Sequence, residues 1–414
     1  MTYTYRVAFI LCRYPLGISS MIVNSIKLFA QQGISVDVYI GKKSFDECPI
    51  SFTDSNICLY IVEDKGFSFL FRTYRFIMRN MSNLLYPFIK RCSFKSSLMI
   101  ISPEVYRFSL WLRRIIDFDC YDYVFPIDCY SLISLYDMLN KDKIIYYNME
   151  LLDWSANNIV YGNKLIVKEL EYRMIKYLQC AVLPSHARAD AFSGINKFAP
   201  EKTKILPIAA MGDPVAKKSR YFREKFSIPD DHIVIIYAGN FESWFQCTEI
   251  IDSIRTYRGP YVLVMHTWKQ SFTETNYFKD MVKHASGLPV FFSTEYISAD
   301  YFSTAFSSAD IGLAFYEDLD DNFREILFSS NKIGEYLKAG LSIVTSNFKP
   351  LYDFVHKHKI GQAISINDIP IAIEAITNQL GEYRSNAIAC YNDHYRFESH
   401  FENFYNFLYN PGHE

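Results

Sequence analysis

The sequence predicts an α/β protein made of two tandem domains with parallel sheets. At 414 residues, the chain is long enough for two domains of roughly 100–200 residues each. Short β-type runs alternate with helical stretches from one end to the other, which is the pattern of α/β folds. Hydrophobic residues make up 50% of the chain and charged residues 21%, so each domain has enough apolar side chains for a core.

The first half contains six candidate strands, each a short run rich in β-branched or aromatic residues. They span residues 7–12, 35–40, 121–127, 143–147, 180–184 and 205–207. Helical stretches lie between them, for example at 19–31 and 164–178. Gly33 follows the first of these helices, at the position where a left-handed residue is preferred.

A break in this alternation spans residues 211–231. It contains two prolines, one glycine and mostly polar or charged residues, so we expect a linker with a small surface helix. The alternation then restarts, with candidate strands at 233–238, 261–266, 290–292, 310–315, 342–345 and 362–365 and an aromatic-rich helix at 391–409.

These boundaries predict two Rossmann-like domains, 1–210 and 232–390, that face a central cleft. The tail, 391–414, is expected to be a helix that packs back toward the N-terminal domain. Ligands of open α/β sheets bind at the carboxyl ends of the strands, so the cleft is the expected binding site.

Composition excludes several classes of protein. A net charge of −2 argues against a globally basic nucleic-acid binder. The nine cysteines are odd in number and contain no C-x-x-C pair, which disfavours a disulfide framework and a zinc ribbon. Reduced thiols, no apolar run of roughly 18–20 residues and no basic n-region at the N-terminus indicate a cytoplasmic location.

The standard phosphate-binding and hydrolase motifs are missing. There is no G-x-G-x-x-G, P-loop, G-x-S-x-G or H-E-x-x-H pattern. Two D-x-D patterns occur, at 117–119 and 318–320. Their number matches chance, so we predict no metal site.

The most informative segment is FSSNKIGEYLKAGLSIVTS, residues 328–346. It has the pattern of a loop, a helix over 331–339, a turn and a strand. Ser329 and Ser330 are candidate N-caps, and Gly340 has the place of the glycine that ends a helix.

Three features of this helix favour a ligand. Lys332 lies in the first turn, where the helix dipole disfavours a cation unless an anion is bound. Gly334 lies mid-helix, where it costs about 1 kcal/mol relative to alanine but permits close approach of a backbone or ligand. Glu335 shares a face with Asn331, about 6 Å along the axis from it at 1.5 Å per residue.

That spacing matches a nucleoside diphosphate. The free N–H groups at the helix start, together with Lys332, can hold a diphosphate, and a carboxylate at Glu335 can accept from both ribose hydroxyls. The alternative is an ordinary amphipathic helix with an exposed Lys–Glu pair.

The string NKIGEYLKAGLSIV, from Asn331 to Val344, resembles the nucleotide-sugar motif of GT-B-fold glycosyltransferases, especially bacterial enzymes of the family-4 type. The order of motifs supports this resemblance, since YAGN at 237–240 opens the second domain and SADIG at 308–312 precedes a strand. The resemblance implies a GT-B fold, with acceptor binding in 1–210 and donor binding in 232–390.

The resemblance also implies a set of donor-binding residues on three loops and one helix start. Glu335 would bind the ribose, Ser330, Asn331 and Lys332 the diphosphate, Gly239 and Asn240 the phosphates, and Tyr296 would lie near the base. The helix N-terminus would stabilise the leaving diphosphate, so no metal and no cofactor besides the donor are expected.

Two positions depart from the family pattern. Retaining members commonly carry a second glutamate where this chain has Leu327, and Glu325 is out of register. Ser342 replaces the usual proline.

The expected function is transfer of a sugar from a nucleotide sugar to a glycan or lipid-linked acceptor in bacterial surface polysaccharide synthesis. The alternatives are a nucleotide-sugar 2-epimerase and a non-catalytic, membrane-associated binding protein of the same fold.

In the first domain, the loop CRYPLG at 12–17 follows the first strand. In this fold such a loop faces the cleft, and Arg13 and Gly17 are candidates for contact with phosphate or acceptor. The alternative is an ordinary surface loop.

Two polar residues of the first domain are candidate catalytic groups. Glu150 and His186 each follow a predicted strand, so either side chain can face the cleft and take a proton from an acceptor hydroxyl. Asp153 is a rival to Glu150, and Asp128 ranks behind His186. Glu150 as a structural anchor and His186 as a helix cap are the plain alternatives.

A basic, aromatic stretch spans residues 65–114. It contains ten Lys or Arg, one acidic residue and eleven aromatics, so its charge of +9 is set against −11 in the rest of the chain. This composition is typical of a segment lying on anionic lipid, and we expect peripheral membrane contact there. The alternative is a helix pair with a solvated basic face.

Overall fold

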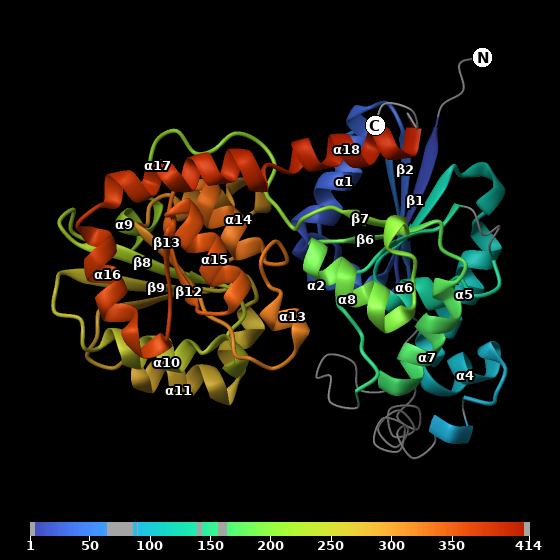
Figure 1. Cartoon of the computed structure of the whole chain (residues 1–414), viewed down its shortest axis with the longest axis horizontal. Helices are drawn as coiled ribbons and strands as arrows, with labels where there is room; N and C mark the ends of the chain where they lie inside the picture. Colours follow the sequence, from blue (N-terminus) through green and yellow to red (C-terminus); the bar gives the residue numbers. More distant parts are fainter. Residues whose placement is uncertain (1–4, 64–85, 89, 139–142, 156–163, 410–414) are drawn as a thin grey trace. The chain divides into compact units, whose positions relative to one another are not determined.

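The structure is a computed structural model that describes residues 5–63, 86–88, 90–138, 143–155 and 164–409. The chain forms two compact units (Figure 1). Unit 1 comprises Met1–Leu206 and His400–Glu414, and unit 2 comprises Pro207–Ser399.

The strands of unit 1 are parallel and arranged in the orders β3-β2-β1-β4 and β5-β6-β7. Two isolated parallel bridges link β4 to the segment of β5. The bounds are β1 Arg6–Leu11, β2 Ser35–Gly41, β3 Ile57–Val62, β4 Tyr123–Pro126, β5 Ile145–Tyr147, β6 Cys180–Leu183 and β7 Thr203–Ile205.

The helices of unit 1 are α1 Ser20–Gln31, α2 Lys42–Glu47, α4 Phe94–Ile101, α5 Pro103–Ile115, α6 Asp128–Ser134, α7 Lys164–Ile175, α8 His186–Asn196 and the part of α18 (Phe397–Tyr409) from His400 onward. Aromatic rings pack α1 and α18 against the sheet, since Phe29 contacts both Phe125 and Phe401. In Figure 1 these two helices lie side by side. This packing accounts for part of the aromatic content of the chain.

Unit 2 contains one six-stranded parallel sheet in the order β10-β9-β8-β11-β12-β13. Its strands are β8 Ile233–Ala238, β9 Tyr261–His266, β10 Val290–Ser293, β11 Ile311–Ala314, β12 Ser342–Ser346 and β13 Gly361–Ile364. The central strands are almost continuously apolar because helices cover both faces of the sheet (Figure 1).

The helices of unit 2 are α9 Tyr221–Lys225, α10 Cys247–Ile254, α11 Asn276–His284, α12 Phe302–Phe306, α13 Asp321–Arg324, α14 Asn331–Lys338, α15 Lys349–His358, α16 Ile369–Thr377 and α17 Leu380–Cys390. A π-helical turn, Tyr391–Tyr395, follows α17.

The α/β class with parallel sheets is confirmed, and all twelve predicted strands correspond to observed ones within about two residues. Three details differ. The edge strand β3 was not predicted, although its residues ICLYIV are of the β-type. The helix predicted at 391–409 is interrupted by the π-helical turn before α18. The segment predicted as a linker, 211–231, clusters with unit 2.

No helix in the described ranges combines the length and the apolar character that a bilayer span requires.

Candidate functional site

The candidate donor site lies where the strand order of unit 2 changes direction. Strand β8 lies between β9 and β11, so the chain leaves these strands toward opposite sides of the sheet. Ligands of open α/β sheets bind at such a point, beyond the carboxyl ends of the strands. The groups at this point are the loop after β8, from Gly239, and the loop after β11, which includes Tyr316.

Lys332 lies in the first turn of α14, and its ammonium group is surrounded by aromatic rings. Its Nζ is 4.3 Å from the ring centre of Phe245, 4.8 Å from that of Tyr237 and 5.1 Å from that of Tyr316. We call this arrangement the Lys332 cage. In the part of the chain that the structure describes, no acidic side chain pairs with Nζ. Burial lowers the pKa of Lys332 to about 8, so the cage holds a cation that an anionic ligand would stabilise.

Gly239 lies directly beside the Lys332 cage. A Cβ added at Gly239 would be 2.8 Å from Nζ of Lys332, so any other residue here would displace the ammonium group. The next residue, Asn240, is held by its neighbours. Its carbonyl accepts from the Tyr237 hydroxyl at 2.7 Å, and its Oδ1 accepts from Trp268 Nε1 at 3.0 Å. The structure therefore brings Gly239 to Lys332 and anchors the loop through Asn240.

Glu335 lies one turn further along α14, where it meets α12. Ser303 Oγ donates a hydrogen bond of 2.5 Å to Oε2 of Glu335. Burial raises the pKa of the Glu335 carboxyl above its ordinary value, and the bond from Ser303 partly opposes that shift. Oε1 remains for another donor, such as a hydroxyl of a bound ligand.

The loop before α14 is tightly held. Ser330 is the N-cap residue, but its side chain does not cap the helix and instead makes a 2.6 Å hydrogen bond with the Tyr316 hydroxyl. Phe328 has a φ of 65°, a strained conformation for a bulky residue, and its ring packs on Tyr395. This loop leads directly into α14, in which Asn331 is the first residue.

Gly334 makes room for protein. An added Cβ would lie 3.1 Å from the Tyr395 ring and 3.7 Å from the backbone of Ala209 and Ala210. The close approach expected at Gly334 is therefore made by other segments of unit 2.

Tyr296, on the loop after β10, is 58% exposed.

In unit 1, the corresponding change in strand order is between β1 and β4. Tyr14 follows β1, and Asp128 follows β4 with a φ of 61°. Burial raises the pKa of the Tyr14 hydroxyl, the negative charges of Glu150 and Asp128 raise it further, and Arg188 lowers it. These four side chains therefore form one cluster at the carboxyl ends of the strands, in which Asp128 is a buried carboxylate.

The backbone of Glu150 holds this residue in the cluster. Its carbonyl accepts from Nδ2 of Asn148, which also donates to the Tyr146 hydroxyl. The other two candidates stand apart. His186 is exposed at the first position of α8, and Asp153 accepts from the backbone and hydroxyl of Ser155 in a local turn.

Arg13 and Gly17 make contacts within unit 1 that explain their presence. Arg13 forms a 2.8 Å ion pair with Glu104 and stacks 4.4 Å from the ring centre of Tyr130. A Cβ on Gly17 would lie 2.6 Å from Sγ of Cys48. The structure thus gives both residues a packing role, and it keeps the Arg13 charge neutralised by a carboxylate.

Sequence reasoning missed Ser303, the rings of the Lys332 cage and Tyr14. Ser303 and the rings are far from Lys332 or Glu335 in sequence, and no spacing rule connects them. Tyr14 belongs to the loop at 12–17, and its position directly after a strand was a usable signal.

Comparisons of the whole chain identify its fold. The sucrose-phosphate synthase of Thermosynechococcus elongatus matches with a TM-score of 0.67 and 13% identity, over 99% of this chain and 100% of that one. HepE of Anabaena, in complex with UDP-glucose, matches with a TM-score of 0.67 and 11% identity, over 98% and 99%. WaaG, a glycosyltransferase involved in lipopolysaccharide biosynthesis, matches with a TM-score of 0.61 and 13% identity, over 98% and 100%.

No protein-family model and no curated protein sequence matches the chain. The structural neighbours are GT-B glycosyltransferases, and the matches cover both units. The resemblance of residues 331–344 is therefore confirmed at the level of the fold, and the chain has the two-domain GT-B fold of nucleotide-sugar glycosyltransferases.

Proposed function

We propose that the protein transfers a sugar from a nucleoside diphosphate sugar to a glycan or a lipid-linked acceptor in bacterial surface polysaccharide synthesis. The observation that carries the proposal is the grouping of Gly239, Lys332 and Glu335 at one end of the unit 2 sheet. Lys332 and the start of α14 bind the diphosphate, and Glu335 binds the ribose. The positive charge of Lys332 and the helix dipole stabilise the leaving diphosphate without a metal.

Acceptor activation is assigned to unit 1. Glu150 takes the proton of the acceptor hydroxyl, with Asp128 and His186 as the other candidates. Asp128 has support from its burial and its place after β4, because a carboxylate at the carboxyl end of a parallel strand lies where ligands of such sheets bind. The structural neighbours support a uridine nucleotide as the first donor to test, since HepE is described with UDP-glucose.

Nucleotide binding is the direct test of this proposal. UDP, GDP, CMP, ADP and dTDP are added, with and without EDTA, while the melting temperature is followed. A ligand at 100 times its dissociation constant adds about 2.7 kcal/mol to stability. We expect one nucleotide to raise the melting temperature of the wild type, with EDTA having no effect, and to raise that of the Glu335→Ala variant much less.

Product analysis then separates sugar transfer from epimerisation. Transfer requires an acceptor, whereas an epimerase converts the free nucleotide sugar alone. If no nucleotide stabilises the wild type, the donor site is refuted.

The pH dependence of nucleotide binding tests the role of Lys332. Only the protonated ammonium attracts a diphosphate, and its pKa of about 8 means that it is mostly charged at pH 7 and mostly neutral at pH 9. Affinity for the stabilising nucleotide is expected to fall by about tenfold over that range.

Two variants of Lys332 serve as controls in isothermal titration calorimetry. Lys332→Met should bind the nucleotide weakly at both pH values, so its affinity should not fall between pH 7 and pH 9. Lys332→Arg keeps its charge throughout, so its affinity should stay level. A wild-type affinity that rises with pH would exclude Lys332 as the diphosphate cation.

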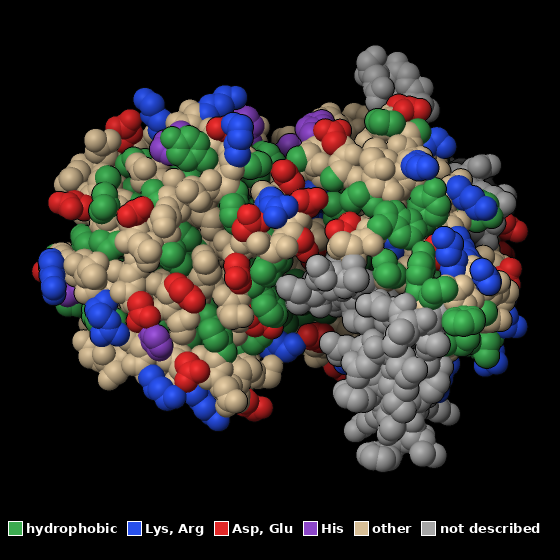
Figure 2. Space-filling model, turned by 60° about the horizontal axis from the view of Figure 1, so that its bottom comes forward, with side chains coloured by type: hydrophobic (Ala, Val, Ile, Leu, Met, Phe, Trp, Pro, Cys, Tyr) green, Lys and Arg blue, Asp and Glu red, His purple; other side chains and the backbone are tan. Residues whose placement is uncertain are grey.

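Contact with anionic lipid is proposed for the basic, aromatic stretch 65–114. Residues 64–85 and 89 lie outside the described residues, so the structure bears only on the remainder. There, Phe88 and Met99 are 70% and 45% exposed, and Lys90, Arg91, Lys95, Arg107, Arg113 and Arg114 are exposed as well. Figure 2 shows basic and hydrophobic side chains intermingled on the unit that carries α5.

Vesicle sedimentation tests the lipid contact. Each Lys or Arg near an anionic surface contributes about 1 kcal/mol. The protein should bind vesicles containing phosphatidylglycerol and not pure phosphatidylcholine, and Lys95→Glu with Arg114→Glu should release it. The matched change, Lys217→Glu with Lys279→Glu in unit 2, should not. Equal binding to both kinds of vesicle would contradict the proposal.

A further inference from the structure

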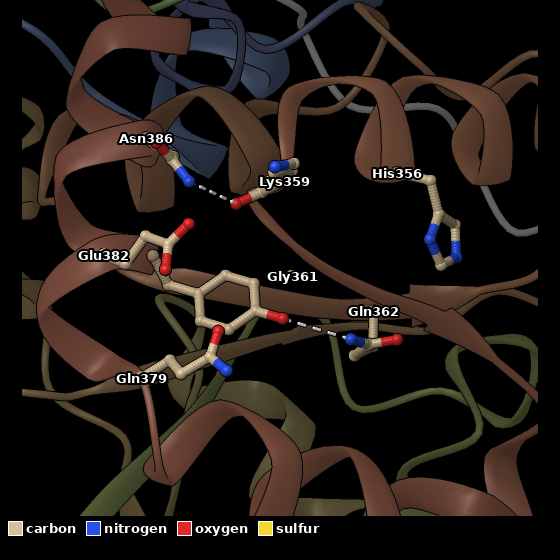
Figure 3. Close-up of a pocket in the computed structure, with 8 residues that line it drawn as sticks. His356, Lys359, Gly361, Gln362, Gln379, Glu382 and Asn386 are labelled. Atoms are coloured by element: carbon tan, nitrogen blue, oxygen red, sulfur yellow. Dashed lines mark hydrogen bonds between the residues drawn. The ribbon is translucent and has the colours of Figure 1, made fainter.

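A pocket of unit 2 lies away from the candidate donor site. It has a volume of about 230 Å³ and lies between the end of α15, the start of β13 and helix α17 (Figure 3). It is lined by His356, Lys359, Gly361, Gln362, Gln379, Glu382, Tyr383 and Asn386. All strands of this sheet run parallel. The pocket is therefore at the amino edge, whereas the donor candidates follow the carboxyl ends.

Hydrogen bonds hold two of the polar side chains that line the pocket in place. Asn386 Nδ2 donates to the carbonyl of Lys359 at 3.0 Å, and Gln362 Nε2 donates to the Tyr383 hydroxyl at 3.2 Å. Both bonds are drawn in Figure 3. These bonds fix the orientation of the two amide groups, and each amide oxygen can still accept a hydrogen bond from a ligand.

Two further side chains supply uncommitted polar groups. In the described part of the chain, neither the Gln379 amide nor the Glu382 carboxylate makes a hydrogen bond or ion pair with another side chain. Figure 3 shows both at the same side of the pocket, with His356 across from them. The charge of Lys359 offsets that of Glu382, so the lining favours a neutral polar ligand over an anion.

We propose that this pocket binds one sugar residue of a glycan, separately from the donor site. Amides and a carboxylate present the paired donors and acceptors that neighbouring hydroxyl groups require, and the Tyr383 ring adds an apolar surface for the C–H face of a sugar. A cavity of about 150 Å³ holds benzene, so 230 Å³ in an open pocket suits one pyranose ring. The remaining sugars of a chain would extend into solvent.

This proposal rests on the lining of the pocket and not on the transferase activity. A glycan held at the amino edge of the sheet would keep a growing chain bound to the protein while its end is processed elsewhere. The two sites can therefore be tested independently.

Saturation-transfer NMR on the full chain tests the pocket. The probes are the methyl glycosides of glucose, galactose, N-acetylglucosamine and rhamnose, added in the presence of UDP. We expect at least one glycoside to show saturation transfer. The combined variant Gln379→Ala and Glu382→Ala should weaken its affinity by about tenfold, as expected for the loss of two hydrogen bonds. Both residues are exposed, so the melting temperature should not change.

Two control variants make the result specific. Glu374→Ala removes an exposed carboxylate from the neighbouring helix α16 and should leave glycoside affinity unchanged. Glu335→Ala, which alters only the donor site, should do the same. The proposal is overturned if no glycoside binds, if the pocket variant binds as the wild type does, or if Glu335→Ala abolishes the signal. The last result would place the sugar in the donor site instead.

Discussion

Replacing Glu335 by alanine is expected to lower kcat/KM for the nucleotide sugar by about 10- to 150-fold. A hydrogen bond to a charged group contributes about 1.5–3 kcal/mol, and each 1.4 kcal/mol is a factor of ten. Ribose binding is present in the ground state as well as in the transition state, so the loss should appear mainly in KM. Steady-state kinetics measure kcat and KM, with the sugar donor that carries the nucleotide found to raise the melting temperature.

Ser303 provides the matched control for Glu335. Ser303 Oγ donates to Oε2 of Glu335, so Ser303→Ala leaves the carboxylate in place but less well oriented. This variant should raise KM by less than Glu335→Ala does, because the carboxylate that would bind the ribose is retained. If Glu335→Ala leaves KM unchanged while Ser303→Ala raises it, the carboxylate is not the ribose ligand.

The largest effect on stability is expected for Lys168→Met in unit 1. Lys168 and Glu171 are 0% and 1% exposed at their side chains and form a 2.7 Å ion pair. The Lys168 ammonium also donates to Asn196, and the Tyr146 hydroxyl donates to Glu171. Removing one partner leaves an uncompensated buried charge, which costs about 3–5 kcal/mol. In a unit of this size that corresponds to a fall of about 6–20 °C in melting temperature.

Scanning calorimetry measures this fall in melting temperature, and two further variants serve as controls. Lys42→Met removes one partner of an exposed pair with Asp46 and should cost no more than about 1 kcal/mol. Lys168→Met combined with Glu171→Leu removes both buried charges and should recover much of the loss. Equal melting temperatures for Lys168→Met and the wild type would show that the pair is not essential to unit 1.

The donor-site candidates illustrate how far sequence reasoning reached. Lys332 and Glu335 were singled out because a cation in the first turn and a carboxylate one turn later are unusual for a purely structural helix. Helix periodicity places such residues on known faces. The side chains that contact Lys332 and Glu335 belong to distant parts of the sequence. Phe245, Tyr316 and Ser303 reach Lys332 and Glu335 only because β8 and β11 end, and α12 begins, at the same edge of the sheet.

Unit 1 illustrates the opposite case. Arg13 has the charge for a phosphate contact, but folding pairs it with Glu104, which is 91 residues away along the chain. Glu104 is the one acidic residue of the basic stretch 65–114. No local pattern connects the two, so only the tertiary structure could show that this charge is already neutralised.

The sequence by itself determined the α/β class, the two-part organisation and the position of helix α14, which carries Lys332 and Glu335. These features depend on local periodicity, turn residues and helix ends, which are encoded within a few residues. The tertiary structure decided which side chains surround Lys332, what holds Glu335, and where a pocket such as the one beside β13 forms. Those features depend on contacts between distant segments, which strand order and packing create and no local pattern records.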